Sequence, residues 1–241
     1  MRRDQHFSSV GGMLPDYSSA VLRRPRPRQY FAGTVRVPYI APWTGENAPP
    51  AAITTRLGRG GMGIGYADEY GIAERRRGAL WIRVPVKPGA GAPLLDRVHA
   101  LRQRQAMNFM LCQCCGRPTD DRRDGRRLFL LHAGTGRPIT DGERTTAPPV
   151  CEGCVVEAWG HPSARRGCVA VLVEEATAWG VAGVGYAPAT LRPVPGEHGE
   201  RFTFVAYGDP RLRWTLACRE VVALHGCTVV DLEDLRERTA V

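Results

Sequence analysis

The sequence predicts an α+β fold, and three kinds of pattern lead to that class. Short apolar runs rich in β-branched residues predict strands, and a longer apolar stripe with helical spacing predicts a helix before residue 112. Two C-x-x-C pairs lie between these elements. A chain of 241 residues with 43% hydrophobic residues can bury one large core or two small ones.

Residues 1–55 are expected to form a disordered or draped arm that is basic and rich in proline and arginine. The prolines favour an extended, hydrated backbone. Nine arginines and three acids within residues 1–60 supply +6 of the formal charge of +9. Such an arm attracts nucleic acid or acidic proteins electrostatically. Its candidate contact residues are Arg23, Arg24, Arg26 and Arg28.

Residues 56–111 are expected to contain a Gly-rich loop, a strand and a helix. The glycines of residues 57–63 resemble the phosphate loop of protein kinases, but the other kinase motifs are absent, so we interpret this segment as a flexible loop. Residues 79–86 predict a strand and residues 93–110 an amphipathic helix. Arg102 and Arg104 are assigned to the solvated face of this helix, with a nucleic-acid contact surface as the alternative.

Residues 112–160 carry the most specific pattern in the chain. Cys112 and Cys115 are separated by two residues, and the same spacing separates Cys151 and Cys154, which precede a predicted helix. Two such pairs provide the four thiolates of a closed tetrahedral site with no open position for water. The sequence therefore predicts one structural Zn²⁺ ion held by these four cysteines, with Cys114 outside the ligand set because it breaks the spacing.

The expected order of elements in this module resembles a treble-clef zinc finger, with a knuckle, a hairpin over residues 127–136 and a ligand-bearing helix. It also resembles the frame of HNH endonucleases, a likeness that implies a catalytic His132. The acid usual before that histidine is replaced by Leu131, and the family's asparagine has no counterpart in residues 144–149. The likeness therefore implies a catalytically degenerate module, with His132 catalytic only if the protein is a nuclease.

Residues 161–241 are expected to form a mixed strand and helix unit that shares one core with residues 78–160. Strands are predicted over residues 168–173, 182–186, 202–207 and 227–232, and a helix capped by Asp209 is predicted from Pro210 to Gly226. The cysteines of this unit fall in apolar patterns and are expected to be core residues; they are Cys168, Cys218 and Cys227.

The stretch from Gly78 to Val230 resembles a group of uncharacterised actinobacterial zinc-binding proteins. The likeness rests on residues 98–107, 112–116, 148–151 and 206–210. It implies the paired cysteines and the layout of the chain, and it implies no activity.

The leading functional expectation is a non-enzymatic, zinc-stabilised binding or adaptor protein, regulatory in role. Its partner is a protein or a nucleic acid, and neither a membrane nor a small-molecule substrate is predicted. One alternative is a nucleic-acid-binding protein that uses the arm and the helix arginines, and a second is an HNH-like endonuclease. Paired cysteines without a leader pattern predict a cytoplasmic protein. With zinc bound, residues 112–154 have a net charge of about −1, so this module alone is a weak candidate for phosphate binding.

Overall fold

The computed structural model describes residues 27–58, 60–69, 74–120, 122–132, 138–159, 168–196 and 200–231. Strands predominate in this part of the chain, and two α-helices accompany them, α1 (Ala100–Asn108) and α2 (Glu152–Trp159). The mixed, sheet-rich fold agrees with the predicted α+β class. None of the helices in the described residues has the length and apolar character needed to cross a membrane.

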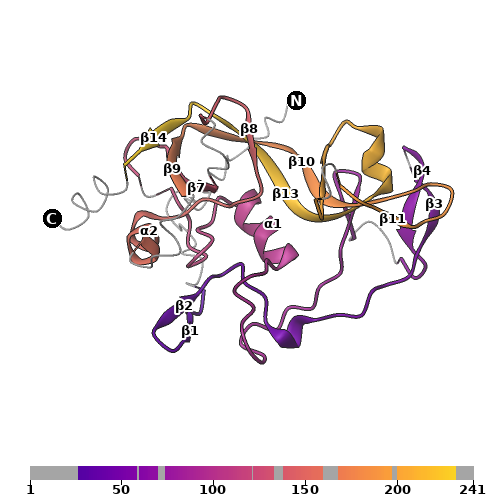
Figure 1. Cartoon of the computed structure of the whole chain (residues 1–241), viewed down its shortest axis with the longest axis horizontal. Coiled ribbons are helices and arrows are strands. Elements are labelled where there is room, and N and C mark those ends of the chain that lie inside the picture. The colour runs from indigo at the N-terminus through magenta and orange to yellow at the C-terminus, as the bar shows by residue number, and fades with distance from the viewer. Residues whose placement is uncertain are drawn as a thin grey trace, which may run out of the picture.

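The largest sheet has seven strands and runs through the middle of the molecule (Figure 1). Its main path follows the order β11-β10-β13-β6-β5, while β12 pairs with β10 and β8 pairs with β13. The strands are β5 (Arg75–Arg76), β6 (Ala79–Trp81), β8 (Glu143–Thr145), β10 (Glu175–Tyr186), β11 (Pro193–Val194), β12 (Thr203–Ala206) and β13 (Thr215–His225). Among the strand pairs of this sheet in the described residues, only β6 and β13 are parallel.

Strand β13 replaces most of the predicted helix over residues 210–226, so that prediction was wrong. Asp209 does cap Pro210, but the element it starts is the short 3₁₀ helix η4 (Pro210–Trp214). Most of β13 is buried, because β6 and β8 flank it on one side and β10 on the other. A strand with apolar residues on both faces lacks the polar alternation that identifies strands, so its pattern also fits a helix.

A second sheet has the order β14-β9-β7 and lies beside the cysteine-rich segment. Its strands are β7 (Arg127–His132), β9 (Cys168–Val173) and β14 (Thr228–Val230), all within the ranges expected to be extended. The predicted hairpin would pair β7 with the strand that directly follows it. Instead, β7 pairs antiparallel with β9, which follows α2 in the chain. The turn proposed at residues 134–136 lies outside the described residues.

Helix α1 is shorter than predicted, and its polar residues are more buried. It begins after His99, whose ring Nδ1 accepts a hydrogen bond from the backbone of Arg102. Arg102 is 5% exposed, so the expected solvated face is wrong for this residue, and the adjacent Gln103 is 0% exposed. The Gln103 side-chain amide donates to the Glu220 carbonyl and accepts from the Glu220 N–H, both at 2.9 Å. Glu220 lies on β13 between the residues that pair with β6 and those that pair with β8.

The N-terminal segment is ordered and packed from residue 27 onward. It contains β1 (Tyr30–Ala32), β2 (Val35–Val37) and the 3₁₀ helix η1 (Thr44–Glu46), which lie below α1 in Figure 1. Val37, Ile40 and Trp43 are buried. Residues 27–55, which belong to the expected disordered or draped arm, are therefore packed on the rest of the protein, while residues 1–26 lie outside the described part.

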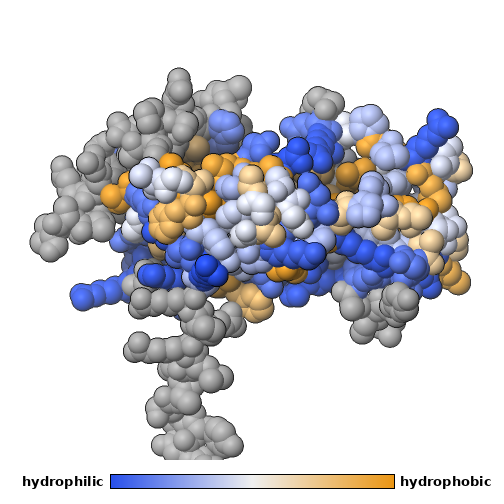
Figure 2. Space-filling view, turned by 90° about the horizontal axis from the view of Figure 1, so that it is seen from below, coloured by the Kyte–Doolittle hydropathy of each residue, from blue (hydrophilic) through white to orange (hydrophobic). Residues whose placement is uncertain are grey.

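The Gly-rich segment forms a β-hairpin rather than the expected flexible loop. Strands β3 (Ile53–Gly58) and β4 (Gly61–Tyr66) pair along six positions, and Gly61 adopts a φ of 100° at the turn. The hairpin stands at the end of the molecule opposite α2 (Figure 1). Seen from below, hydrophilic residues extend across the molecule and hydrophobic residues appear in several separate places (Figure 2).

Candidate metal centre

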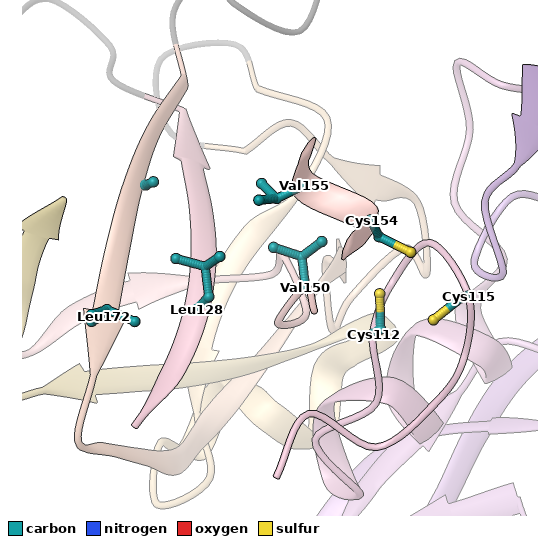
Figure 3. Close-up of a cluster of buried hydrophobic side chains, with 8 residues drawn as sticks. Cys112, Cys115, Leu128, Val150, Cys154, Val155 and Leu172 are labelled. Atoms are coloured by element: carbon teal, nitrogen blue, oxygen red, sulfur yellow. The ribbon is translucent and has the colours of Figure 1, made fainter. Parts of the chain in front are cut away.

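The four predicted cysteines converge on one site. The sulfur atoms of Cys112, Cys115, Cys151 and Cys154 all lie within 4.8 Å of one another. The first two residues belong to the loop between α1 and β7, and the other two lie at the start of α2. Figure 3 shows the sulfurs of Cys112, Cys115 and Cys154 pointing toward a common centre.

The first pair lies in a tight backbone turn, a knuckle over residues 111–118. Leu111 and Pro118 form an isolated bridge, and the Cys112 N–H donates to the carbonyl of Arg117 at 2.7 Å. Gly116 closes the turn with a φ of 70°, and a Cβ at this position would lie 2.8 Å from the Tyr39 ring. Both the conformation and the space therefore require glycine here.

The second pair is held by the first turn of α2. The Val155 N–H donates to the Cys151 carbonyl at 3.0 Å, and the backbone of Cys154 hydrogen-bonds the Cys151 sulfur. Val150 and Val155, each 1% exposed, anchor this end of the helix against Leu128 of β7. The helix N-terminus favours negative charge, which suits thiolate ligands.

The thiols of this cluster strongly affect one another's ionisation. Hydrogen bonding from Cys114 and Cys115 lowers the pKa of Cys112. Hydrogen bonding with Cys112 and with the other neighbouring thiols raises the pKa of Cys154. Proton loss from all four thiols places several negative charges within a few ångströms, which requires a cation among them.

Arg36 adds positive charge near the cluster. Although partial burial acts to lower it, the pKa of Arg36 is raised by Glu157 and by the thiols of Cys154 and Cys115. The guanidinium is paired with Glu157 of α2 at 3.0 Å. A divalent cation held by four thiolates would have a net charge of −2, and Arg36 would offset part of it.

The spacing of the sulfur atoms fits a four-coordinate metal. Zinc–sulfur bonds of about 2.3 Å in a tetrahedron place the sulfurs about 3.8 Å apart. The sulfurs of Cys115 and Cys151, which come from the two different pairs, are 3.8 Å apart. A disulfide requires about 2.0 Å, so this geometry matches shared coordination of one ion. Four thiolates in this arrangement suit zinc or iron.

The remaining cysteines lie outside the four-sulfur group. Cys114 is half-buried in the knuckle and hydrogen-bonds Cys112, in agreement with the spacing argument that excluded it. Cys218 is buried in β13, where burial raises its pKa to about 11. Cys168 and Cys227 are half-buried.

His132 lies at the exposed end of β7, opposite Cys168 of β9. Among the described residues, the four cysteines are the sole group of three or more His, Cys, Asp or Glu side chains that is placed to hold a metal. The structure therefore does not bring His132 together with two further ligands of a second metal within the described part of the chain.

The arginines predicted to contact nucleic acid occupy different environments. Arg28 is exposed and stacks 5.2 Å from the centre of the Tyr30 ring. Arg104 is half-buried and stacks 4.4 Å from the centre of the Trp81 ring. Arg102 is buried in an ion pair with Glu46, which removes it from the surface. Arg23, Arg24 and Arg26 lie outside the described residues.

Residues of the N-terminal segment that support the knuckle were missed at the sequence level. The Tyr39 N–H donates to the Cys114 carbonyl at 2.9 Å, and the Gln29 side chain donates to the Cys115 carbonyl at 3.0 Å. The aromatic residues Tyr30, Tyr39 and Trp43 are the one sequence signal of such anchoring. They do not indicate which surface the segment covers.

No family model, no curated protein and no solved structure matches this chain. The class of site therefore rests on the geometry alone, which defines a four-cysteine cluster able to hold a metal ion.

Proposed function

We propose that this chain is a non-enzymatic binding or adaptor protein whose fold is stabilised by one structural zinc ion. The observation that supports the proposal most directly is the cluster formed by Cys112, Cys115, Cys151 and Cys154. Four protein thiolates complete the coordination of zinc and leave no position for a reactive water, which is the arrangement of structural rather than catalytic sites.

The arrangement of the ligand-bearing elements supports a treble-clef-like module. A knuckle supplies the first pair of thiols and the N-terminal turn of α2 supplies the second. The pairing of β7 with β9 departs from a simple hairpin. The module thus includes β9, the strand that follows α2. Through β9, the module is joined to the rest of the core.

A metal held in this way connects parts of the chain that are far apart in sequence. Residues 112–115 are linked to residues 151–154, and both pairs contact a core cluster that includes Leu128 and Leu172. Reduced thiols are stable in a reducing compartment, so we place the protein in the cytoplasm.

Metal analysis combined with thermal unfolding tests the proposal. The wild-type protein should contain one zinc per chain, and Cys151→Ser should lose most of it. The substitution should lower the Tm by about 10 °C or more, because each kcal/mol lost shifts the Tm of a chain of this size by about 2–4 °C. A strong chelator should lower the Tm of the wild type to a similar extent.

Cys114→Ser is the matched control, because this residue lies in the same knuckle but outside the four-sulfur group. It should retain one zinc and nearly the wild-type Tm. Equal zinc content in Cys151→Ser and wild type contradicts the assignment of Cys151 as a zinc ligand. Iron found in place of zinc contradicts the assignment of zinc as the bound metal. Divalent-ion-dependent DNA cleavage that His132→Ala abolishes contradicts the non-enzymatic part.

A further inference from the structure

The outer face of the seven-stranded sheet combines aromatic rings with arginines. Val222 and Leu224 of β13 pack in one buried cluster with Met107 of α1, so they and Glu220, two residues earlier, lie on the side of the sheet that α1 covers. Successive residues of a strand point to opposite faces, so Arg219 lies on the outer face. Arg219, Ala182 and Phe204 are paired across β13, β10 and β12, and Phe204 is 37% exposed.

A cleft of about 430 Å³ lies on this face, within the range of volumes typical of ligand sites. Three aromatic residues, Trp179, Phe202 and Phe204, contribute to its lining. Arg144 and Arg211 contribute guanidinium groups, and Glu200 and Asp209 contribute carboxylates. The Asp209 carboxylate is paired with Arg211 at 2.7 Å and also caps η4, so its charge is compensated locally.

The arginines on this face stack against the aromatic rings. The Arg144 guanidinium lies 4.1 Å from the centre of the Trp179 ring. Arg201 and Arg219 each lie 5.4 Å from the centre of the Phe202 ring. Within the described residues, these three arginines have no carboxylate partner at ion-pair distance.

We infer that this face binds single-stranded nucleic acid, with unpaired bases stacked on its aromatic and guanidinium planes and phosphates paired with its arginines. The inference rests on the proposed binding function and specifies its partner. Aromatic rings bind unpaired bases of any sequence by stacking, and arginine planes do the same. The guanidinium groups of Arg144, Arg201 and Arg219 supply positive charge beside these rings, which favours a polyanion.

The chemistry favours nucleic acid over an acidic protein. Carboxylates on a protein partner would use the guanidinium groups but would gain little from the three aromatic rings that line the cleft. A duplex is also a poor fit, because its bases are already stacked and their faces are not available to the rings.

Fluorescence anisotropy with labelled dT12 and rU12 tests the inference on the full chain, with a 12-base-pair duplex and poly-glutamate as competitors. Both single strands should bind more tightly than the duplex. Trp179→Ala and Phe202→Ala should each weaken binding about 10-fold or more. Arg144→Gln should reduce the slope of log affinity against log salt by about 0.7, the value for one phosphate contact to a single strand.

Arg97→Gln is the matched control, because it removes an arginine with a 61% exposed side chain away from this face. It should change the affinity less than two-fold. Unchanged affinity in Trp179→Ala and Phe202→Ala overturns the inference, since the basic N-terminal residues would then account for binding. Tighter binding of the duplex, or competition by poly-glutamate equal to that of unlabelled dT12, also overturns it.

Zinc content measured on the same preparations separates this inference from the proposed function. A zinc-loaded chain that binds no oligonucleotide refutes the nucleic-acid inference and leaves the zinc-stabilised binding protein standing. A chain that binds the oligonucleotides but contains no zinc supports the nucleic-acid inference and refutes the zinc-stabilised part of the proposed function.

Discussion

Glu46 is the residue around which the N-terminal segment is organised. Its carboxylate is fully buried and forms two hydrogen bonds with the Arg102 guanidinium, at 2.6 and 2.7 Å. It also accepts the backbone N–H groups of Trp43 and Lys87, both at 2.8 Å. One side chain thus connects the N-terminal segment, the loop after β6 and helix α1.

The ionisation of Glu46 makes the protein sensitive to acid. Burial acts to raise its pKa, but the hydrogen bonds from Arg102 and the two backbone groups lower it to about 2. A carboxyl with a lowered pKa stabilises the folded state fully above its unfolded pKa of about 4.5, and this contribution of about 3 kcal/mol is lost as the pH falls toward 2. Urea unfolding between pH 6 and pH 2.5 measures the loss.

Replacing Glu46 tests the same contact at neutral pH. Glu46→Gln should destabilise the protein by about 3–5 kcal/mol, because it leaves the buried Arg102 without a counter-charge. Asp96→Asn is the control, since its exposed carboxyl is 3.9 Å from Arg97, and it should change stability by less than about 0.5 kcal/mol. Equal effects of the two substitutions contradict the structural role assigned to Glu46.

The metal ligands were predictable residue by residue, whereas Arg102 was not. The C-x-x-C spacing is local, and the chemistry of zinc restricts it strongly. The burial of Arg102 depends on Glu46, which lies 56 positions away in sequence. A single sequence contains no signal that pairs these two residues, so the helix pattern alone placed Arg102 at the surface.

At the level of elements, the close contact between β10 and its neighbours depends on glycine. A Cβ on Gly183 would lie 2.2 Å from the Leu216 carbonyl oxygen of β13. This contact is with backbone, so it cannot be relieved by rotating a side chain. A bulge in the pairing occurs at the same place, between Ala182 and Gly183.

Gly183→Ala should therefore separate β10 from β13 locally and destabilise the protein by about 1–3 kcal/mol, the range for overpacking. Gly185→Ala is a control in the same strand, because a Cβ added there would meet no atom within 4 Å, and it should have little effect. Chemical denaturation of the two variants measures the difference. Similar stabilities would show that β10 has room to move.

The prediction of elements succeeded where the pattern was local and failed where burial depended on distant partners. Strand β9 and helix α2 lie where the apolar runs and the second cysteine pair indicated. Strand β13 was mistaken for a helix, because Asp209 and Pro210 are a genuine helix start and the apolar residues that follow satisfy both periodicities. Only its pairing with β6, β8 and β10 determines that it is a strand.

On the scale of the whole molecule, the four-cysteine cluster and the central sheet belong to adjoining parts of one fold. The knuckle, α2 and the N-terminal segment surround the cluster, and the Ile40 N–H donates to the Gln113 carbonyl at 3.3 Å. The central sheet is stabilised mainly by the pairing of β10 with β13. Loss of the metal should therefore affect the two parts unequally.

Hydrogen exchange before and after chelation tests this division. Removal of the metal should accelerate exchange at the amides of residues 112–116 and 152–159, and at Tyr39 and Ile40, which bond to knuckle carbonyls. The amides shared by β10 and β13 should stay protected. Equal acceleration throughout the chain would show instead that the protein unfolds as one unit without metal.

The position of β13 in the chain has a consequence for biosynthesis. This strand lies at the centre of the large sheet, yet it spans Thr215–His225 and its partners β6, β8 and β10 are all made before it. Until about 225 residues of the chain have been synthesised, β6, β8 and β10 cannot pair with β13, the strand that joins them. Closure of the sheet must therefore await synthesis of residues 215–225, and ribosome stalling upstream of Thr215 would release a chain with unpaired strand edges exposed to aggregation.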